Sequence, residues 1–211
     1  MKRGRRKVEN PATARRILAA AEQHFAAQGM AGARTEEIAA AARANKAMLY
    51  YYFGNKRRLH RAVLENLFRQ LRGVYSAPKK EASPGRRLRA YITGYFDFLA
   101  GHPNYPRLVH REAMEATRNF DWIVQQYLRP FHNQLVRTIE QGVATGEFRP
   151  VDPTHMAFSI LGMTTSYFAA APILSAMANR QLLAPHALEE RKRSLLDFIH
   201  HGLTRGQAGV L

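Results

Sequence analysis

Three residues suited to begin an α-helix, Thr35, Asn45 and Asn55, are spaced ten positions apart. Thr and Asn side chains accept hydrogen bonds from the free backbone N–H groups of a first helical turn, so each residue is a candidate N-cap. Gly29 precedes them as a candidate left-handed C-cap. Caps this close together leave room only for short helices joined by tight turns. The spacing therefore predicts a supersecondary motif rather than a bundle of long helices.

The flanking segments also have helical periodicity. Ala14, Ile17, Leu18, Ala21 and Phe25 lie on one face of a helix predicted from Ala12 to Gln28. Beyond Asn55, four apolar residues recur at every fourth position of a long helix: Leu59, Val63, Leu67 and Leu71. No alternating strand pattern persists anywhere in the 211 residues, so the predicted fold class is all-α.

The rest of the chain is predicted to form longer helices after a loop at Ala77–Gly85. Pro130 and Pro172 should each kink the helix that contains it. The expected helices are 86–101, 107–118, 120–145, 154–179 and 185–205. We expect an N-terminal domain at residues 1–56 and a C-terminal helical bundle at residues 57–211.

The charge distribution points to a polyanionic partner for the N-terminal third. The net charge is +16, and residues 1–72 hold 16 Lys and Arg against 5 Asp and Glu, an excess of 11. An excess of this size favours nucleic acid or an anionic surface. Residues 153–179 carry no charged side chain, but their Ser and Thr content and Pro172 favour a buried interface helix over a membrane span. The absence of cysteine suits a reducing cytoplasm.

Helices at 35–42 and 46–52, joined by a turn at 43–45, are the parts of a helix-turn-helix. The second helix would enter a major groove of DNA by its N-terminus, which brings Lys46, Ala47 and Met48 nearest the base edges. Leu49 and Phe53 should turn inward, toward Ile38 and Ala39. Three consecutive tyrosines, Tyr50–Tyr52, cannot all be core, because neighbours on a helix point about 100° apart. They are expected to face the groove and the phosphates.

Residues Thr13–Leu64 resemble the N-terminal domain of the tetracycline-repressor (TetR) family of bacterial transcription regulators. The resemblance rests on Ile17-Leu18, Phe25, Gly29, Thr35, Ile38-Ala39, Leu49-Tyr50-Tyr51, Phe53 and Lys56 in consistent order and spacing. It implies that Thr35, Tyr51 and Lys56 hold phosphates and that Lys46, Met48 and Tyr50 line the groove. The full set of expected DNA-binding residues is Thr35, Arg43, Asn45, Lys46, Ala47, Met48, Tyr50, Tyr51, Tyr52 and Lys56.

Two positions depart from the pattern of the family. Arg43 stands where the family often has Gly, so a left-handed conformation there would strain the backbone by about 1 kcal/mol; Arg43 is also a further candidate for a phosphate contact. Arg57 and Arg58 follow Lys56, where acidic residues are common in the family. Both changes add positive charge to the expected DNA-binding surface. The basic arm Met1–Lys7 can either reach a minor groove or remain a solvated tail.

The C-terminal two-thirds is expected to bind a ligand and to dimerise, because the resemblance implies a homodimer formed by the last two helices. An excess of aromatic residues there suits a small-molecule cavity. The expected liners are Tyr95, His110, Met114, Trp122, Tyr127 and Tyr167. Arg111 is left with two roles, binding an anionic ligand or pairing with Glu112 or Glu115.

Other classes of protein are less well supported. The chain has no glycine-rich phosphate loop and no hydrolase or metalloprotease motif, so no catalytic residue, metal site or cofactor is expected. We expect a cytoplasmic regulator, a repressor as in most of the family, that binds a palindromic double-stranded DNA operator and is released by a small-molecule effector of unknown identity. No membrane partner is expected. The alternative is an architectural DNA-binding protein without an effector.

Overall fold

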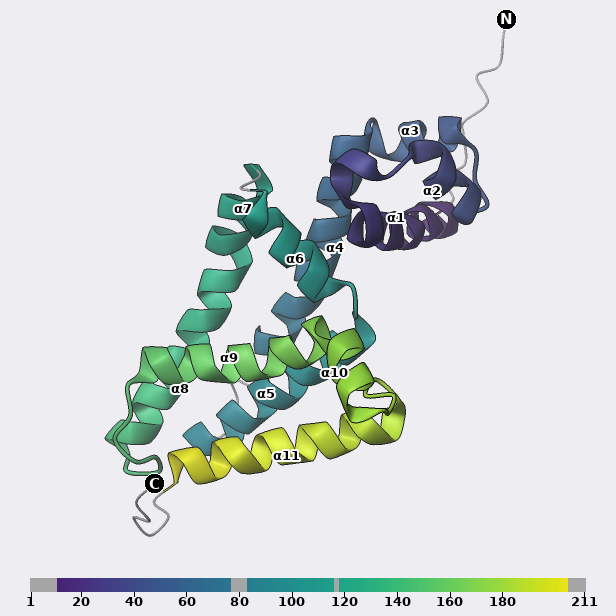
Figure 1. Cartoon of the computed structure of the whole chain (residues 1–211). Coiled ribbons are helices and arrows are strands. Elements are labelled where there is room, and N and C mark those ends of the chain that lie inside the picture. The colour runs from purple at the N-terminus through teal and green to yellow at the C-terminus, as the bar shows by residue number, and fades with distance from the viewer. Residues whose placement is uncertain (1–10, 77–82, 116–117, 205–211) are drawn as a thin grey trace, which may run out of the picture. The chain divides into compact units, whose positions relative to one another are not determined.

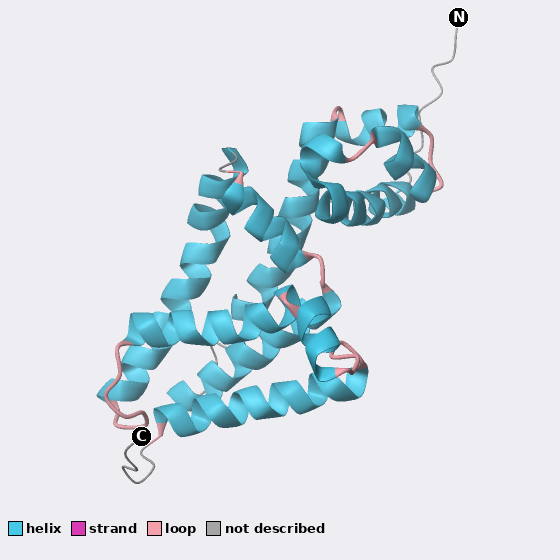
Figure 2. Cartoon of the chain, in the orientation of Figure 1, coloured by secondary structure: helices cyan, strands magenta, loops and turns pink. Residues whose placement is uncertain are grey.

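The computed structural model describes residues 11–76, 83–115 and 118–204, and every regular element in those ranges is helical. Figures 1 and 2 show these helices and the loops between them. The all-α prediction is confirmed. The arm Met1–Lys7 and residues 77–82 of the predicted loop lie outside the described residues. The elements are α1 (Pro11–Gly32), α2 (Thr35–Ala41), α3 (Lys46–Phe53), α4 (Lys56–Ser76), α5 (Pro84–Gly101), α6 (Tyr105–Met114), α7 (Arg118–Ile123), the π-helix η2 (Val124–Leu128), α8 (Arg129–Ala144), α9 (Pro153–Ala169), α10 (Ala171–Ala178) and α11 (Pro185–Leu203).

The chain divides into two compact units, one ending at Asn66 and the other beginning at Leu67. Their boundary therefore falls inside α4. The boundary expected from the sequence lies ten residues earlier, after Lys56, which is the first residue of that helix. The difference arises because the first part of α4 supplies core residues to the N-terminal unit, among them Leu59, Val63 and Leu64.

The N-terminal unit has a core to which each of its helices contributes. Ile17, Phe25, Ile38, Leu49 and Leu59 are all completely buried. Large apolar side chains removed from water in this way each stabilise the unit by about 1.5–3 kcal/mol. The predicted apolar face of α1 is thus confirmed at Ile17, Ala21 and Phe25.

The end of α1 differs from the prediction. Gly29 does have the expected positive φ, 72°, but its ψ of 174° interrupts the helix without ending it. A further helical turn follows, and the element ends at Gly32. The amide of Ala33 donates to the carbonyl oxygen of Gly29 at 3.2 Å, which secures this last turn.

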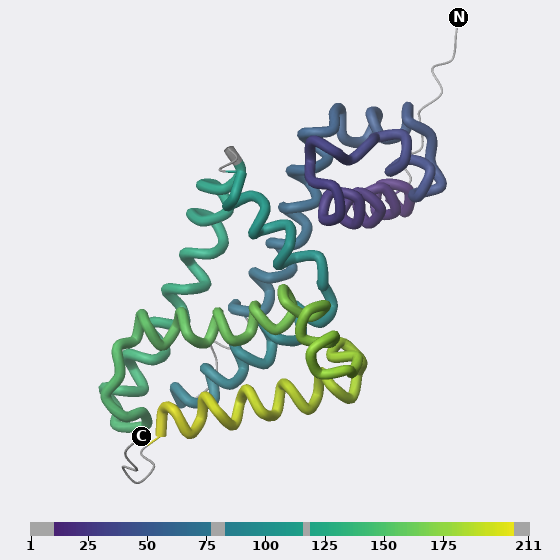
Figure 3. Tube along the Cα trace, viewed as in Figure 1, coloured from purple at the N-terminus to yellow at the C-terminus, as the bar shows by residue number. Residues whose placement is uncertain are grey.

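In the C-terminal unit, α8 packs against α5 and α9, and α11 packs against the same two helices (Figure 3). Leu195, Ile199 and Leu203 of α11 are at most 4% exposed within this unit. The C-terminal unit therefore covers these three side chains by itself. The large apolar side chains that remain exposed on these helices are Phe158 of α9 and Phe198 of α11.

Pro130 produces a wide turn where the sequence predicts a kink. Proline has no backbone N–H, so Pro130 cannot donate to the carbonyl four residues earlier. The chain forms the π-helix Val124–Leu128 just before it, and the amide of Arg129 donates to Val124. The predicted helix 120–145 is therefore divided into α7, η2 and α8.

The predicted helix 154–179 breaks at Ala170, two residues before Pro172. Pro172 lies in the first turn of α10, where a missing N–H does no harm. Among the described helices, none is by itself long and apolar enough to span a bilayer. Helices α9 and α10 have the length and apolar composition of a membrane span only when taken together, and the angle between them is 72°.

We predict that Gly142→Ala destabilises the protein by about 1–3 kcal/mol, because the added methyl group would overlap the ring of Phe148. Gly73→Ala is the matched control in another helix, where nothing lies within 4 Å of the added carbon. It should be neutral or stabilise by up to about 1 kcal/mol, as alanine is the better helix former. Urea unfolding of both variants measures this difference, and equal stabilities would contradict the prediction.

Candidate DNA-binding and ligand-binding sites

The turn between α2 and α3 contains a left-handed residue, Arg43. Arg43 has a φ of 50° and its side chain is exposed. The amide of Ala44 donates to the carbonyl of Ala39 at 2.9 Å, and the Nε of Arg16 donates to the carbonyl of Ala42 at 3.0 Å. A left-handed arginine costs about 1 kcal/mol in strain. These hydrogen bonds hold the turn in that conformation.

Asn45 and Asn55 are N-caps, as predicted. The Oδ1 of Asn45 accepts from the amide of Met48 at 2.8 Å, and the Oδ1 of Asn55 accepts from the amide of Arg58 at 2.9 Å. The prediction for Thr35 is wrong by one residue: Arg34 occupies the cap position and makes no side-chain cap, while Thr35 is the first helical residue. Its hydroxyl instead donates to Glu36 at 3.2 Å and lies 3.5 Å from the hydroxyl of Tyr50.

Helix α3 is anchored by Leu49, which is completely buried, and its other side chains follow from that anchor. Tyr50 is 39% exposed and Tyr51 is 47% exposed. Lys46 and Ala47 are exposed as well, whereas Met48, Tyr52 and Phe53 are half-buried. The rings of Tyr51 and Tyr52 meet edge to face, with centroids 5.2 Å apart. One side of α3 thus presents cationic, aromatic and small apolar groups to the exterior.

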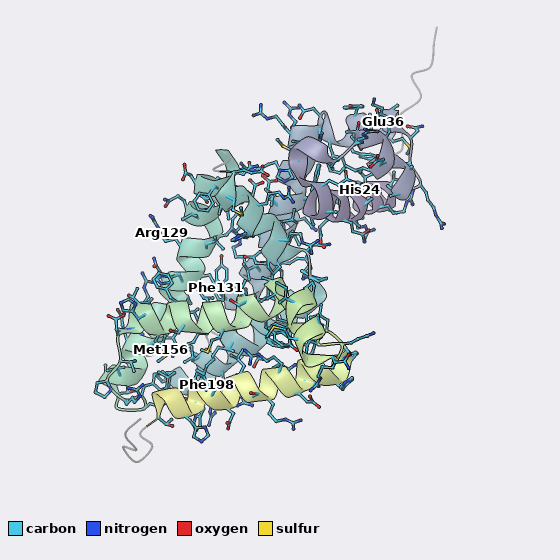
Figure 4. All side chains as sticks on the ribbon, viewed as in Figure 1. His24, Glu36, Arg129, Phe131, Met156 and Phe198 are labelled. Carbon is cyan, nitrogen blue, oxygen red and sulfur yellow. The ribbon has the colours of Figure 1, made fainter. Side chains whose placement is uncertain are left out.

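Lys46 connects α3 to α2 through an ion pair with Glu36, which Figure 4 labels. The ammonium group also lies 5.8 Å from the centroid of the Tyr50 ring. The hydrogen bond from Lys46 is the largest of the effects that lower the pKa of Glu36 to about 2, and Glu36 in turn raises the pKa of Lys46. This pair is not predicted from the sequence, although acids in the first turn of α2 and a lysine at the start of α3 are the signal for it.

Lys56, a predicted phosphate ligand, is engaged within the N-terminal unit. Its Nζ donates to the carbonyl of Ala31 at 2.9 Å, near the end of α1. Helix C-termini carry a partial negative charge that favours a cation in this place. Arg57 and Arg58, the next two residues, are exposed. At the start of α4, Lys56 is therefore hydrogen-bonded to α1, whereas Arg57 and Arg58 are exposed to solvent.

The C-terminal unit contains a groove of about 740 Å³ between α6 on one side and the end of α9 with the start of α10 on the other. Sites for small ligands commonly have volumes of about 300–1,000 Å³. Two predicted liners, His110 and Met114, border this groove. Arg107 of α6 and Phe168 and Ile173 on the opposite wall also border it, and they are missing from the predicted set. Arg111, which the sequence leaves as a possible ligand for an anion, borders it too.

The other four predicted liners lie elsewhere in the C-terminal unit. Tyr95 is 6% exposed and its hydroxyl is 2.8 Å from that of Thr165, a residue of the groove wall, so Tyr95 lies one layer behind the wall. Burial raises the pKa of Tyr95 to about 12. The hydroxyl of Tyr167 donates to the carbonyl of Leu182 at 2.8 Å. Trp122 meets Tyr127 edge to face, and Tyr127 is stacked on Phe68.

The groove wall on α6 is basic. Arg107 and Arg111 are one turn apart and His110 lies between them, so all three share one face of the helix. The guanidinium group of Arg111 lies 3.8 Å from the carboxylate of Glu115, so Arg111 forms one of the two ion pairs that the sequence suggests. In the described ranges, no group of three or more His, Asp or Glu side chains could hold a metal ion.

Comparison with known protein families identifies the class of protein. Residues 84–199 match the model of the tetracyclin repressor-like C-terminal domain, and residues 17–63 match that of bacterial regulatory proteins of the tetR family. The chain belongs to the TetR family. It is a helix-turn-helix DNA-binding transcription regulator, and the expectation that it is not an enzyme is confirmed by this membership.

Individual relatives match this chain over nearly its whole length. The transcriptional repressor NicS of Pseudomonas putida is 28% identical over 195 residues, which are 90% of this chain and 91% of NicS. The ketosteroid regulator KstR2 of Mycobacterium tuberculosis has the same fold, with a TM-score of 0.78 at 20% identity over 95% of this chain and 98% of KstR2. AibR, in complex with isovaleryl coenzyme A and operator DNA, is 25% identical with a TM-score of 0.73 over 88% of this chain and 97% of AibR.

We predict that Lys46→Ala returns the pKa of Glu36 from about 2 toward the ordinary glutamate value of 4.5, because Lys46 is the main cause of the shift. A lowered pKa means that the ion pair stabilises the folded unit above about pH 4.5 and that this contribution is lost as the pH falls through 2. An NMR titration of the Glu36 carboxyl carbon measures the pKa. Lys56→Ala, which removes a cation bonded to a carbonyl, should leave it unchanged. A wild-type Glu36 that titrates near 4.5 would contradict the ion pair.

Proposed function

We propose that the protein is a repressor that binds a palindromic operator as a homodimer and is released from it by a small-molecule effector. The observation that carries the proposal is the outer side of α3, where Lys46, Ala47, Tyr50 and Tyr51 are exposed on a helix fixed by Leu49 and capped by Asn45. A helix presented in this way can enter a major groove. NicS, a repressor by name, and AibR, whose structure includes operator DNA, support this reading.

In the proposed complex, the residues of the helix-turn-helix divide into two groups. Lys46, Ala47, Met48 and Tyr50 would line the groove, with Lys46 donating to guanine and the apolar groups meeting thymine methyls. Lys46 would exchange its bond to Glu36 for one to a base. The remaining set would hold phosphates and the sugar backbone: Thr35, Arg43, Asn45, Tyr51, Tyr52 and Lys56. Such contacts fix the position of a protein on DNA without reading its sequence.

The proposed dimer is formed by α9 and α11. Phe158 is 56% exposed and Phe198, labelled in Figure 4, is 66% exposed, although both are large apolar side chains on long, ordered helices. A contiguous exposed apolar patch marks an interaction surface, and we propose that these two side chains belong to one. A two-fold dimer would place its recognition helices about 34 Å apart or somewhat more, so the operator should be an inverted repeat.

The proposed effector site is the groove between α6, α9 and α10. AibR, the relative with isovaleryl coenzyme A bound, supports control by a small molecule. The effector would favour a dimer whose recognition helices have a different separation, with α4 carrying the change. Weakening operator binding a hundredfold requires a differential affinity of about 2.7 kcal/mol. A transcription regulator of this kind would act in the cytoplasm.

Selection of bound duplexes from a random pool, followed by footprinting, tests the proposal. A discrete inverted repeat is the expected result, whereas diffuse protection would favour the architectural alternative. Lys46→Ala should weaken capture of the selected site by about 10- to 100-fold, the loss typical of one good base contact. Tyr51→Ala should also weaken capture, because it removes a phosphate contact. Retention of selective capture by the double variant would overturn the role of α3.

We predict that Arg57→Ala/Arg58→Ala makes operator binding less sensitive to salt. Each lost phosphate contact should reduce the slope of log affinity against log salt concentration by about 0.9. The matched control is Arg86→Ala/Arg89→Ala, which removes two exposed arginines from α5 of the other unit. A salt titration by fluorescence anisotropy gives the slopes, and an unchanged slope in the first variant would refute the contacts.

We predict that Phe198→Asp produces monomers at micromolar concentration, because a carboxylate would be buried in the proposed interface. Phe198→Leu keeps an apolar group and should remain dimeric. Sedimentation velocity measures the oligomeric state, and circular dichroism checks that both variants fold. A dimeric Phe198→Asp variant, or a monomeric wild-type chain, would place the proposal in error.

A further inference from the structure

The groove between α6, α9 and α10 has two walls of different chemistry. The α6 wall carries the guanidinium groups of Arg107 and Arg111 with the imidazole of His110 between them. The opposite wall carries Phe168 and Ile173, together with small residues of α9 and α10. A molecule that fills this groove therefore meets cations on one side and an apolar surface on the other.

The charges of the groove do not cancel. Arg111 has Glu115 at 3.8 Å, close to the limit for an ion pair, and Glu115 borders the same groove. Arg107 is exposed and makes no ion pair with any residue in the described ranges. Two guanidinium groups against one carboxylate leave one positive charge in the groove. Arginine binds carboxylates and phosphates through paired hydrogen bonds, so this excess favours an anionic group.

The apolar part of the groove is exposed to solvent. Met114 is 75% exposed and Ile173 is 66% exposed, and both border the groove from opposite walls. Between Arg107 and Met114, α6 rises by about 10 Å at 1.5 Å per residue. A ligand with an anionic group at Arg107 would therefore extend for about that length before it covers Met114.

We infer that the effector is an amphipathic anion, with a carboxylate or phosphate held by Arg107 and Arg111 and an apolar chain lying on Phe168, Ile173 and Met114. This inference rests on the proposed function, since it names the chemical class that the effector site takes. A cationic ligand is disfavoured by the surplus arginine, and a neutral one would leave Arg107 unused. Ser166 and Thr165 on the far wall supply hydroxyl groups within the same groove.

Four probes with the same eight-carbon chain separate the possibilities: octanoate, octyl phosphate, octylamine and octanol. Calorimetry on the full-length protein, below the micellar concentration of each probe, gives their affinities. Octanoate or octyl phosphate should bind at least tenfold more tightly than octylamine, and the comparison of the two anions identifies the head group. Equal or tighter binding of octylamine would overturn the inference.

Variants locate the anion. Arg107→Ala/Arg111→Ala should lose at least tenfold in affinity for the preferred anion and leave the affinity for octanol within about twofold. The matched control is Arg69→Ala/Arg137→Ala, which removes two arginines that border a separate groove between α4 and α8. It should bind the anion as the wild type does. Full anion affinity in the first double variant, or an equal loss in the control, would overturn the inference.

Operator capture, measured on the same samples, keeps this inference separate from the proposed function. If the duplex is captured and the preferred anion releases it from the wild type but not from Arg107→Ala/Arg111→Ala, the inference stands. If octanol releases the operator from both proteins alike, the groove is an effector site of a different class and the inference fails alone. If no operator is captured by the wild type, the proposed function fails.

Discussion

The complete burial of Leu49 is the constraint on which the DNA-binding surface depends. Successive residues of a helix point about 100° apart, so fixing one side chain in the core determines the direction of the others. With Leu49 inside, Tyr51 points to the opposite side of the helix and Tyr50 to its flank, and both are exposed. Lys46 is exposed as well, at the start of the helix. Asn45 sets where that start is, because its side chain closes the first turn. The run of three tyrosines is thus compatible with a stable fold.

Two cations of the N-terminal unit, Lys46 and Lys56, have partners within the protein in the absence of DNA. Lys46 is paired with Glu36, and Lys56 is bonded to Ala31. Both bonds are at the surface, where such interactions contribute little to stability and are screened by salt. Exchange of these partners for phosphate or base oxygens therefore requires little free energy. These bonds orient the Lys46 and Lys56 side chains in the free protein, and they are weak enough to be replaced by a stronger acceptor.

The parts of the structure that follow from local chemistry could be predicted from the sequence. The caps at Asn45 and Asn55 and the disturbance near Pro130 each depend on a few neighbouring atoms. From the sequence, the left-handed conformation of Arg43 is only one possibility, raised by the glycine that the family often has there. The predicted N-cap at Thr35 is wrong by one residue, because a threonine can either cap a helix or begin it. The extra turn after Gly29 depends on a hydrogen bond that the pattern of residues does not encode.

The residues that border the groove between α6, α9 and α10 could be predicted from the sequence only in part. Tyr95 and Tyr167 are aromatic residues of the kind that often contact ligands. However, their hydroxyl groups are hydrogen-bonded to Thr165 and to the carbonyl of Leu182, and their rings are buried. Whether an aromatic side chain faces a cavity or another helix is decided by the packing of helices far apart in the sequence. Periodicity within one helix does show which residues share a face, which is why Arg107, His110, Arg111 and Met114 occur together.

The π-helix before Pro130 has a consequence for the phase of the two helices that it joins. A wide turn contains one more residue than an α-turn, so the side chains after it are displaced by about 100° from where an unbroken helix would carry them. Phe131, Leu135 and Ile139 reach the core in this shifted phase. Trp122, on the other side of the turn, keeps the earlier phase and is free to pack on Tyr127. The position of one proline thereby sets the phase in which α8 presents Phe131, Leu135 and Ile139 to the core.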